Sequence, residues 1–349
     1  MEKLTAAERA MAVDAARDLD TTLADIPDSS LAADWSALCS EMAVGLQFGP
    51  ANALAALDRV RRSLLVTGGA RMFAIGSAES QQAIEPGIRD LAASLDSAPA
   101  QKAIYAATRR VDQRLRGREP AAVKPVFVGL LNANSQGGVF LNSAPGTGYH
   151  DTSRDKLLDY LASNLYAGHG AHGIFMKTWA AGLAYSNGIR LRLVDGRLNY
   201  YAERTPELPQ TLKFVIGELN KVQPDAALTD YAIAGAFDGT RSASPYEERG
   251  ESMANDLADG LTPGVISRFH QAILDLRKDA DLGAELFRRM NAVYGTVLPG
   301  MNVKAKDVEG GVYFVIGPEP QLAAWEEYLK KADAPDARVF RLYPRDFWM

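Results

Sequence analysis

A short pattern of a strand followed by a helix occurs twice in this chain, and this repeat constrains the fold more than any other feature. Met72–Gly76 reads Met-Phe-Ala-Ile-Gly, and Tyr313–Gly317, 241 residues later, reads Tyr-Phe-Val-Ile-Gly. A helical pattern follows each segment, which indicates two copies of one kind of domain. The second copy has 186 residues between Val126 and Val312 for its other strands and helices, whereas only 71 residues precede Met72. We therefore expect the opening strands of the first domain to come from another chain or from another part of the same gene product.

The spacing of apolar residues divides the chain into three regions. Residues 4–65 carry apolar residues at helical spacing and are almost free of strand signals, and Arg71–Gly76 is expected to form a short buried strand. Residues 98–125 are rich in arginine, and Pro120 and Pro125 lie at their C-terminal end, which is typical of a linker. The sequence thus predicts an incomplete, mostly helical first domain over 1–97, the linker, and a complete domain over 126–349.

The third region alternates short strands with helices, which predicts an α+β fold. Strands are expected over 126–131 and 138–143, and a hairpin is expected over 189–202 with its turn at Asp195-Gly196. Several helices follow between about 209 and 295. A last strand over 312–317 and a helix around Trp325 close the domain. We expect a mixed or antiparallel sheet with helices packed on one face.

Composition excludes several classes of function. The chain has 349 residues with 43 acidic against 38 basic side chains, so it has no general positive charge that would favour nucleic acid. Its one cysteine rules out an internal disulfide and a multi-cysteine metal site. The first ten residues carry charges from the second position onward, so we expect no secretory signal peptide, and no apolar run is long enough to span a membrane. The compartment stays open between cytoplasm and periplasm.

The four histidines do not form a known metal-binding motif. His150, His169, His172 and His270 all lie outside H-E-x-x-H and H-x-x-E-H. His169 and His172 are three residues apart, but the glycines around them favour a loop over a helical metal site. Gly168–Gly173 matches G-x-G-x-x-G formally, yet it follows a helix instead of a strand, so we treat it as a chance match. An unrelated enzyme that uses His150 or the His169 and His172 pair remains a weaker alternative.

The segment 175–188 is the most specific part of the chain. A helix is expected to end near Gly182, and the chain then enters a strand close to Tyr185. Lys177 and Tyr185 would then share one neighbourhood, which suits binding of a peptide carbonyl or carboxylate, and Ser186 and Asn187 follow directly. The alternative is that Tyr185 is a half-buried sheet residue and Lys177 a solvated helix charge.

In this segment the sequence resembles the M16 family of zinc metallopeptidases, the group of pitrilysin, insulin-degrading enzyme and presequence protease. The resemblance lies in the glycine-rich stretch 167–173, in Gly182–Ser186 before a long hairpin, in Ser244-Pro245 with Leu261–Pro263, and in the closing Ile316-Gly317 strand and helix. It covers most of 126–345, with a weaker match over about 50–95. The resemblance implies duplicated α+β domains in two halves that close over unfolded peptides.

The catalytic half of that family carries H-x-x-E-H, which this chain lacks, so the resemblance is to the C-terminal, non-catalytic half. There the family uses an arginine and a tyrosine to orient the substrate backbone. Tyr185 matches the tyrosine, whereas Thr178 stands where the family has its arginine, with Lys177 adjacent. Lysine supplies charge but not a two-pronged hydrogen-bond donor.

The resemblance implies a non-catalytic part or subunit of an M16-like zinc metalloendopeptidase, which helps to bind peptide and close the chamber and has no activity alone. Zinc would lie only in a catalytic partner half, with no metal and no catalytic residue in this chain. Tyr185, Lys177, Ser186 and Asn187 are the expected substrate-binding residues. The alternative is a catalytically inactive scaffold or peptide-binding subunit.

Overall fold

The computed structural model describes residues 4–24, 28–70, 72, 74–99, 110–119, 126–132, 135–167, 173–238, 245–343 and 346. By its internal contacts the chain forms two compact units. Unit 1 comprises residues 1–37, 108–236 and 268–349, and unit 2 comprises residues 38–107 and 237–267. None of the described helices combines the length and the apolar character needed to cross a bilayer.

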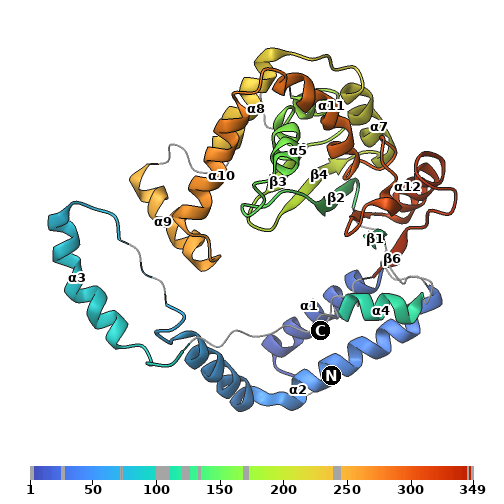
Figure 1. Cartoon of the computed structure of the whole chain (residues 1–349). Coiled ribbons are helices and arrows are strands. Elements are labelled where there is room, and N and C mark those ends of the chain that lie inside the picture. Colours follow the sequence, from blue (N-terminus) through green and yellow to red (C-terminus); the bar gives the residue numbers. More distant parts are fainter. Residues whose placement is uncertain are drawn as a thin grey trace. The chain divides into compact units, whose positions relative to one another are not determined.

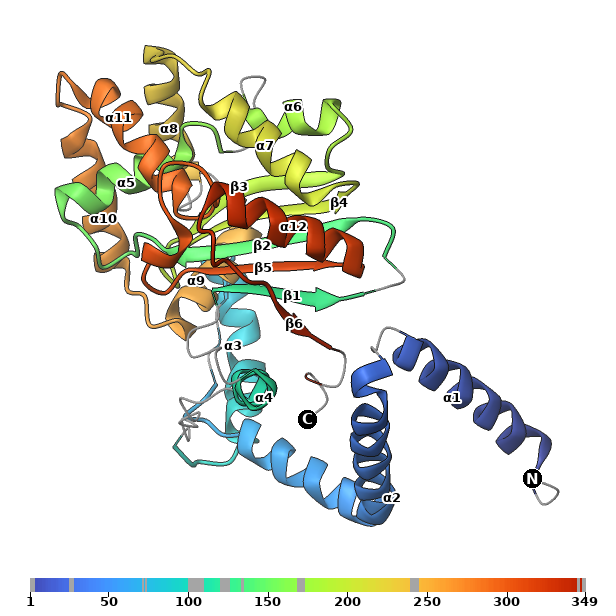
Figure 2. The ribbon, with the colours of Figure 1, turned by 90° about the vertical axis from the view of Figure 1, so that its right-hand side faces the viewer.

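A six-stranded mixed sheet forms the centre of unit 1 (Figures 1 and 2). The strands are β1 (Phe127–Leu131), β2 (Gly138–Pro145), β3 (Ser186–Arg192), β4 (Arg197–Thr205), β5 (Val312–Gly317) and β6 (Phe340–Leu342), in the spatial order β3-β4-β2-β5-β1-β6. β3, β4, β2 and β5 pair antiparallel, whereas β1 runs parallel to both β5 and β6. The expected hairpin is confirmed: Gly196, with φ 60°, turns β3 into β4.

Helices cover one face of this sheet, as the sequence predicts (Figure 2). Those that pack on its strands are α5 (Arg154–Asn164), α6 (Ile174–Ala180), α7 (Leu208–Leu219) and α12 (Glu319–Ala332), and α11 (Leu282–Gly295) packs on α5. The other helices that lie mainly in unit 1 are α8 (Ala226–Asp238) and α10 (Pro263–Leu276). Alternate strand residues point toward the helices that pack on the sheet. Phe140, Tyr200 and Trp325 are fully buried, with the Phe140 ring 5.0 Å from that of Trp325 and 5.7 Å from that of Tyr200. The core of unit 1 therefore lies between the sheet and its helices, and the expected α+β class is confirmed.

The opposite face of the sheet is covered at one end by α4 (Arg110–Arg118). Leu115 of α4 is buried in a cluster with Val128 and Leu342, and Val111 and Phe340 pack around it. Apolar side chains of this kind gain roughly 1.5–3 kcal/mol each on full burial. The stretch expected as a plain linker thus contains a helix that packs on the sheet, although most of its other residues lie outside the described part of the chain.

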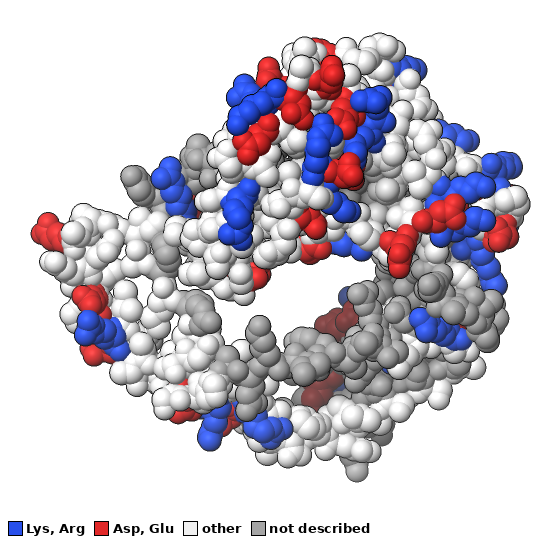
Figure 3. Space-filling view, viewed as in Figure 1, with Lys and Arg blue, Asp and Glu red and all other residues white. Residues whose placement is uncertain are grey.

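Unit 2 is helical. It holds α9 (Tyr246–Ala258), α3 (Ala78–Ala93) and the greater part of α2 (Asp28–Leu64), which bends at Gly49; α1 (Ala6–Ala24) precedes α2. Many of the apolar side chains on α2 and α3 face solvent, as Leu46 (83% exposed), Leu54 (68%) and Leu91 (57%) illustrate. Figure 3 shows few charged side chains over these two helices. Apolar faces of this extent are typical of interfaces.

The expectation of a buried strand over 71–76 is wrong for the residues that the structure describes. Met72 is 42% exposed and Ile75 41% exposed, and residues 72 and 74–76 form no strand. A strand is stable only where its backbone groups have partners on a neighbouring strand. The nearby pairing, a parallel bridge between Val66 and Asp96, does not include these residues.

Asp333 at the end of α12 is buried with only one of its carboxylate oxygens in a hydrogen bond. Oδ1 accepts from the Ala305 N–H at 2.6 Å, and Oδ2 has no partner among the described residues. Burial raises the pKa of this carboxyl above its usual value, although the Ala305 N–H opposes the change. The folded state therefore binds the proton more tightly than the unfolded state, and stability falls as the pH rises from the unfolded pKa, about 3.9, through the raised folded pKa.

We expect Asp333→Asn to remove this loss, because asparagine keeps an oxygen for the Ala305 N–H and carries no charge. Relative to the wild type, the variant should gain stability with rising pH through that window, by about 1.4 kcal/mol per unit of raised pKa. Urea unfolding at several pH values measures the difference. Asp336→Asn, at an exposed position, is the control and should follow the wild type. If the stability difference between Asp333→Asn and the wild type does not change, or falls, as the pH rises through that window, the raised pKa of Asp333 is contradicted.

Candidate site between helix α6 and strand β3

A small hollow of about 190 Å³ lies between α6 and the start of β3. Phe175, Met176 and Trp179 line it from α6, and Tyr185, Ser186 and Asn187 line it from the strand side. Trp179 is 55% exposed, Tyr185 65% and Met176 39%. Large apolar side chains that stay exposed together are unusual outside binding surfaces, and tryptophan and tyrosine are the residues that most often dominate such surfaces.

The fold fixes the two walls of this hollow against each other. Gly182, with φ 70°, ends the helical segment in a conformation that favours glycine, and the chain then turns toward the sheet. The Tyr185 N–H donates to the Glu203 carbonyl of β4 at 3.0 Å, which adds Tyr185 to the sheet just before β3 begins. The expected path, a helix that ends near Gly182 and a strand that starts near Tyr185, is confirmed.

Asn187, at the buried base of the hollow, connects its two walls. Its side chain is 5% exposed, and Nδ2 donates to the Phe175 carbonyl at 3.1 Å. Oδ1 has no hydrogen-bond partner among the described residues. A buried amide oxygen without a partner costs stability, and this oxygen is shielded from solvent at the base of the hollow.

An arginine that the sequence analysis did not single out lies against Tyr185. The Arg204 guanidinium carbon is 4.8 Å from the centre of the Tyr185 ring. Arg204 lies in a β-bulge, since Gly138 pairs with Thr205 and Phe140 with Ala202, so one extra residue of β4 lies between these pairs. Among the residues that the structure describes, Arg204 is also the only one other than glycine whose φ is positive, at 51°. Bulges and strained backbone redirect side chains and are frequent beside functional sites.

Lys177 does not line the hollow. Its ammonium pairs with Glu218 of α7 at 3.1 Å, and Lys221 pairs with the same carboxylate at 2.7 Å. Hydrogen bonds from Lys221 and Lys177 lower the pKa of Glu218. Lys177 therefore joins α6 to α7, and its role toward a substrate stays a prediction.

Thr178, which stands where the M16 family has its arginine, is fully buried and donates to the Ile174 carbonyl at 2.9 Å. This hydrogen bond lies within α6, and because the side chain is buried it cannot take part in the surface of the hollow. The structure thus brings Tyr185, Ser186 and Asn187 together, separates Lys177 from them, and adds Trp179 and Arg204. Trp179 could have been found from the sequence, because it lies two residues beyond Lys177 on a short amphipathic helix. Nothing in the local sequence indicates that Arg204 contacts Tyr185.

No group of three His, Cys, Asp or Glu residues that could hold a metal ion occurs among the residues that the structure describes. His169 and His172 lie outside that part of the chain, as does most of the glycine-rich stretch 167–173. We therefore derive no zinc-dependent step within this chain.

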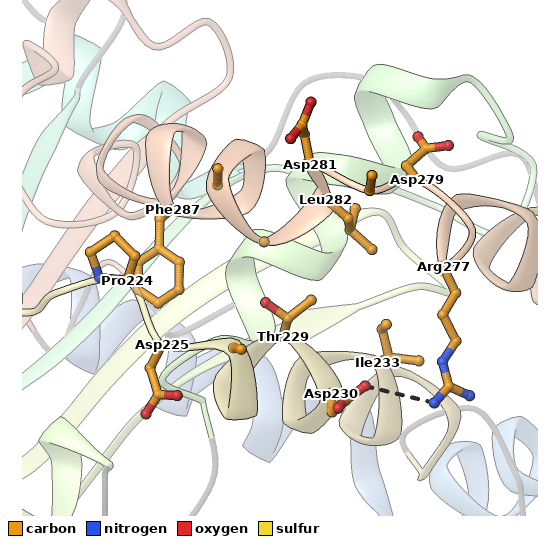
Figure 4. Close-up of a pocket in the computed structure, with 14 residues that line it drawn as sticks. Pro224, Asp225, Thr229, Asp230, Ile233, Arg277, Asp279, Asp281, Leu282 and Phe287 are labelled. Atoms are coloured by element: carbon orange, nitrogen blue, oxygen red, sulfur yellow. Dashed lines mark ion pairs between the residues drawn. The ribbon is translucent and has the colours of Figure 1, made fainter.

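A second, larger hollow of about 430 Å³ lies between the start of α8 and the α10–α11 connection (Figure 4). Three of the carboxylates that line it have partners within the protein. Asp225 accepts from the Ala227 N–H at 2.9 Å, Asp230 pairs with Arg277 at 3.7 Å, and Asp279 pairs with Arg154 at 3.0 Å. On the face seen in Figure 3, acidic and basic side chains are mixed over these helices. The two ion pairs join neighbouring segments of the fold, and the hollow holds none of the residues that the sequence singled out.

Comparison with known proteins gives structural likenesses only. No protein-family model matches the sequence, and no curated protein matches it either. Among solved structures, the chain is similar to a peptidase M16 inactive domain from Pseudomonas fluorescens, with a TM-score of 0.42, 15% identity, and coverage of 68% of this chain and 51% of that one. It is similar to a predicted insulinase family protease from Yersinia pestis, with a TM-score of 0.43, 15% identity, and coverage of 72% and 53%.

It is also similar to the periplasmic protease PqqL from Escherichia coli, with a TM-score of 0.43, 12% identity, and coverage of 77% of this chain and 29% of that one. The chain thus spans about half the length of the first two structures. Structures named as M16 and insulinase-family proteases, one of them an inactive domain, are therefore among those that this chain resembles, as the sequence led us to expect.

Proposed function

We propose that this chain is a non-catalytic, peptide-binding part of an M16-like zinc metalloendopeptidase. The supporting observation is the hollow that the exposed Trp179 and Tyr185 side chains line, with the Arg204 guanidinium against the Tyr185 ring. In this proposal a partner half holds the zinc and its activated water, and this chain closes the chamber and holds the peptide. Unfolded peptide is the substrate class.

Each group in the hollow has a role that fits peptide binding. The Tyr185 hydroxyl can donate to a peptide carbonyl and accept from a peptide N–H. The Arg204 guanidinium offers several donors to a carbonyl or a terminal carboxylate, so it supplies the charge that Thr178 cannot. The Trp179 and Tyr185 rings provide flat apolar area for a side chain of the peptide. Ser186 and Asn187 lie at the base, where Asn187 joins the strand side of the hollow to α6 through the Phe175 carbonyl.

A scaffold role is the second candidate, and two observations favour it. Lys177 is engaged by Glu218, and Thr178 is buried in place of an arginine, so two positions that would otherwise contact substrate have structural roles. A scaffold would leave peptide turnover by the partner half independent of the hollow. The two candidates therefore differ in how turnover responds to changes at Tyr185 and Arg204.

We expect Tyr185→Phe and Arg204→Gln each to lower peptide turnover by the assembled pair about 3- to 30-fold, mainly through weaker peptide binding. Each substitution removes hydrogen bonds to the peptide; such a bond contributes about 0.5–1.5 kcal/mol between neutral groups, as for Tyr185, and about 1.5–3 kcal/mol with a charged group, as for Arg204. The assay mixes the full chain with a catalytic half and follows cleavage of a fluorogenic peptide. Arg192→Gln, at an exposed position on the same hairpin, is the control and should leave turnover unchanged. Unchanged turnover in both test variants would favour the scaffold.

A further inference from the structure

Arg204 is an exposed cation that no carboxylate of the described residues neutralises. Its guanidinium carbon lies 4.8 Å from the centre of the Tyr185 ring, and it forms no ion pair with any residue that the structure describes. Lys177 of α6 differs, because the Glu218 carboxylate already pairs with it at 3.1 Å. Arg204 therefore places a free positive charge beside the hollow that Tyr185 lines.

The backbone holds Arg204 on Tyr185 and away from the carboxylates that are nearest in sequence. Glu203 and Glu207 lie one and three residues away and are exposed, yet neither pairs with Arg204 within the described part of the chain. Arg204 lies in the bulge of β4 and has a φ of 51°, so its side chain leaves the strand in a direction that regular strand residues do not take. Strained backbone of this kind is frequent where a side chain contacts a ligand.

The hollow itself has room for one large side chain. Its volume of about 190 Å³ is below the roughly 300–1,000 Å³ of pockets that enclose a whole small molecule. Met176 and Trp179 form its apolar wall on α6, and both are exposed. The Tyr185 ring lines the hollow and also contacts the Arg204 guanidinium. The surface therefore suits an apolar side chain with a negative charge a short distance away.

The spacing of side chains in an extended peptide fits this arrangement. Side chains two residues apart point to the same side of such a peptide and lie about 6.6 Å apart. When one apolar side chain lies against Tyr185, the second side chain can reach a guanidinium that is 4.8 Å from the centre of the same ring. A carboxylate on the second side chain would accept a charge-assisted hydrogen bond from Arg204.

We propose that the hollow selects extended peptides in which a large apolar residue is followed, two residues later, by an aspartate or glutamate that binds Arg204. The inference rests on the proposed peptide-binding function and names the peptides that this site prefers. An acidic side chain is the expected source of the carboxylate, because an endopeptidase acts on the interior of a chain, where there is no terminal carboxylate.

Three peptides with a fluorescent label at the N-terminus test this preference by anisotropy titration with the full chain. The first carries Phe and, two residues later, Glu in a Gly-Ser background with an amidated C-terminus, and the second has Gln in place of Glu. We expect the first to bind about 3- to 10-fold more tightly, between the values for an exposed ion pair and for a hydrogen bond to a charged group. The third peptide ends at that Gln with a free carboxylate and should bind like the second.

Arg204→Gln should abolish the preference, so that the Glu and Gln peptides bind within about 2-fold of each other. Arg190→Gln is the matched control, because the Arg190 guanidinium stacks on Tyr201 of the same hairpin at 5.1 Å and neither residue lines the hollow. The control variant should keep the full preference for Glu. Circular dichroism should show the same helix content in both variants and in the wild type.

Equal binding of the Glu and Gln peptides to the wild type, or a preference that persists in Arg204→Gln, would overturn the proposal. Tighter binding of the third peptide than of the first would assign the carboxylate to the chain terminus and overturn the choice of an acidic side chain.

Trp179→Ala separates this inference from the proposed function, because it should weaken binding of the Glu and Gln peptides alike. If it leaves both affinities unchanged, or if no peptide binds at all, the peptide site itself is contradicted. If it weakens both peptides but the wild type binds them equally, only the preference for a carboxylate is contradicted.

Discussion

Replacing Trp325 with alanine should lower the free energy of unfolding of unit 1 by about 3–5 kcal/mol. Trp325 is fully buried on α12, where its ring packs edge-on against Phe140 at 5.0 Å and stacks on Tyr328 at 5.1 Å. The substitution leaves a cavity between the helix layer and the middle of the sheet, and the surrounding strands cannot collapse into it without breaking their ladders. Urea unfolding followed by circular dichroism measures the loss.

Trp179→Ala is the matched control, because it removes the same side chain from a position that is 55% exposed. It should change the free energy of unfolding by less than about 0.5 kcal/mol. Equal losses in the two variants would mean that the interface between α12 and the sheet is not the core of unit 1.

The second large effect is expected on peptide binding. The double variant Trp179→Ala and Tyr185→Ala should weaken binding of an unfolded peptide by roughly 30-fold or more, since truncation of one central aromatic residue of an interface often costs about 2 kcal/mol. The two rings line the hollow from opposite walls and are its most exposed apolar groups, so the double change removes much of its apolar surface without touching the core. Isothermal titration calorimetry with the full chain gives the affinity.

Trp35→Ala serves as the control for unspecific apolar contact, because Trp35 is 46% exposed and does not line the hollow. It should leave the affinity unchanged. A double variant that binds peptide as tightly as the wild type would contradict the proposed site, whatever its stability.

Local patterns in the sequence were sufficient to predict most elements of unit 1. The hairpin of β3 and β4 follows from Asp195-Gly196 between two alternating segments, and α12 follows from Leu322, Trp325 and Leu329 at helical spacing. The turn at Gly182 and the position of Tyr185 at the start of a strand were predicted in the same way. These features depend on residues that are close in sequence.

The features that could not be predicted depend on residues far apart in sequence. Residues 126–131 and 138–143 read as two neighbouring strands, yet β5 lies between them in the sheet. Arg204 reaches Tyr185 only because a bulge in β4 redirects it, and no local pattern indicates that bulge. Residues 71–76 have the composition of a buried strand, but composition alone cannot provide the neighbouring strands that such a segment needs.

The position of β1 between β5 and β6 also has a consequence for how the chain is made. β1 is completed at Leu131, but both strands that flank it, β5 and β6, begin only at Val312 and Phe340. During synthesis, β1 must therefore remain without its neighbours until about 180 to 210 further residues have been made. Such a late closing step makes folding slow and exposes an apolar strand to aggregation in the meantime. A nascent chain arrested before Val312 would be the natural substrate for a chaperone.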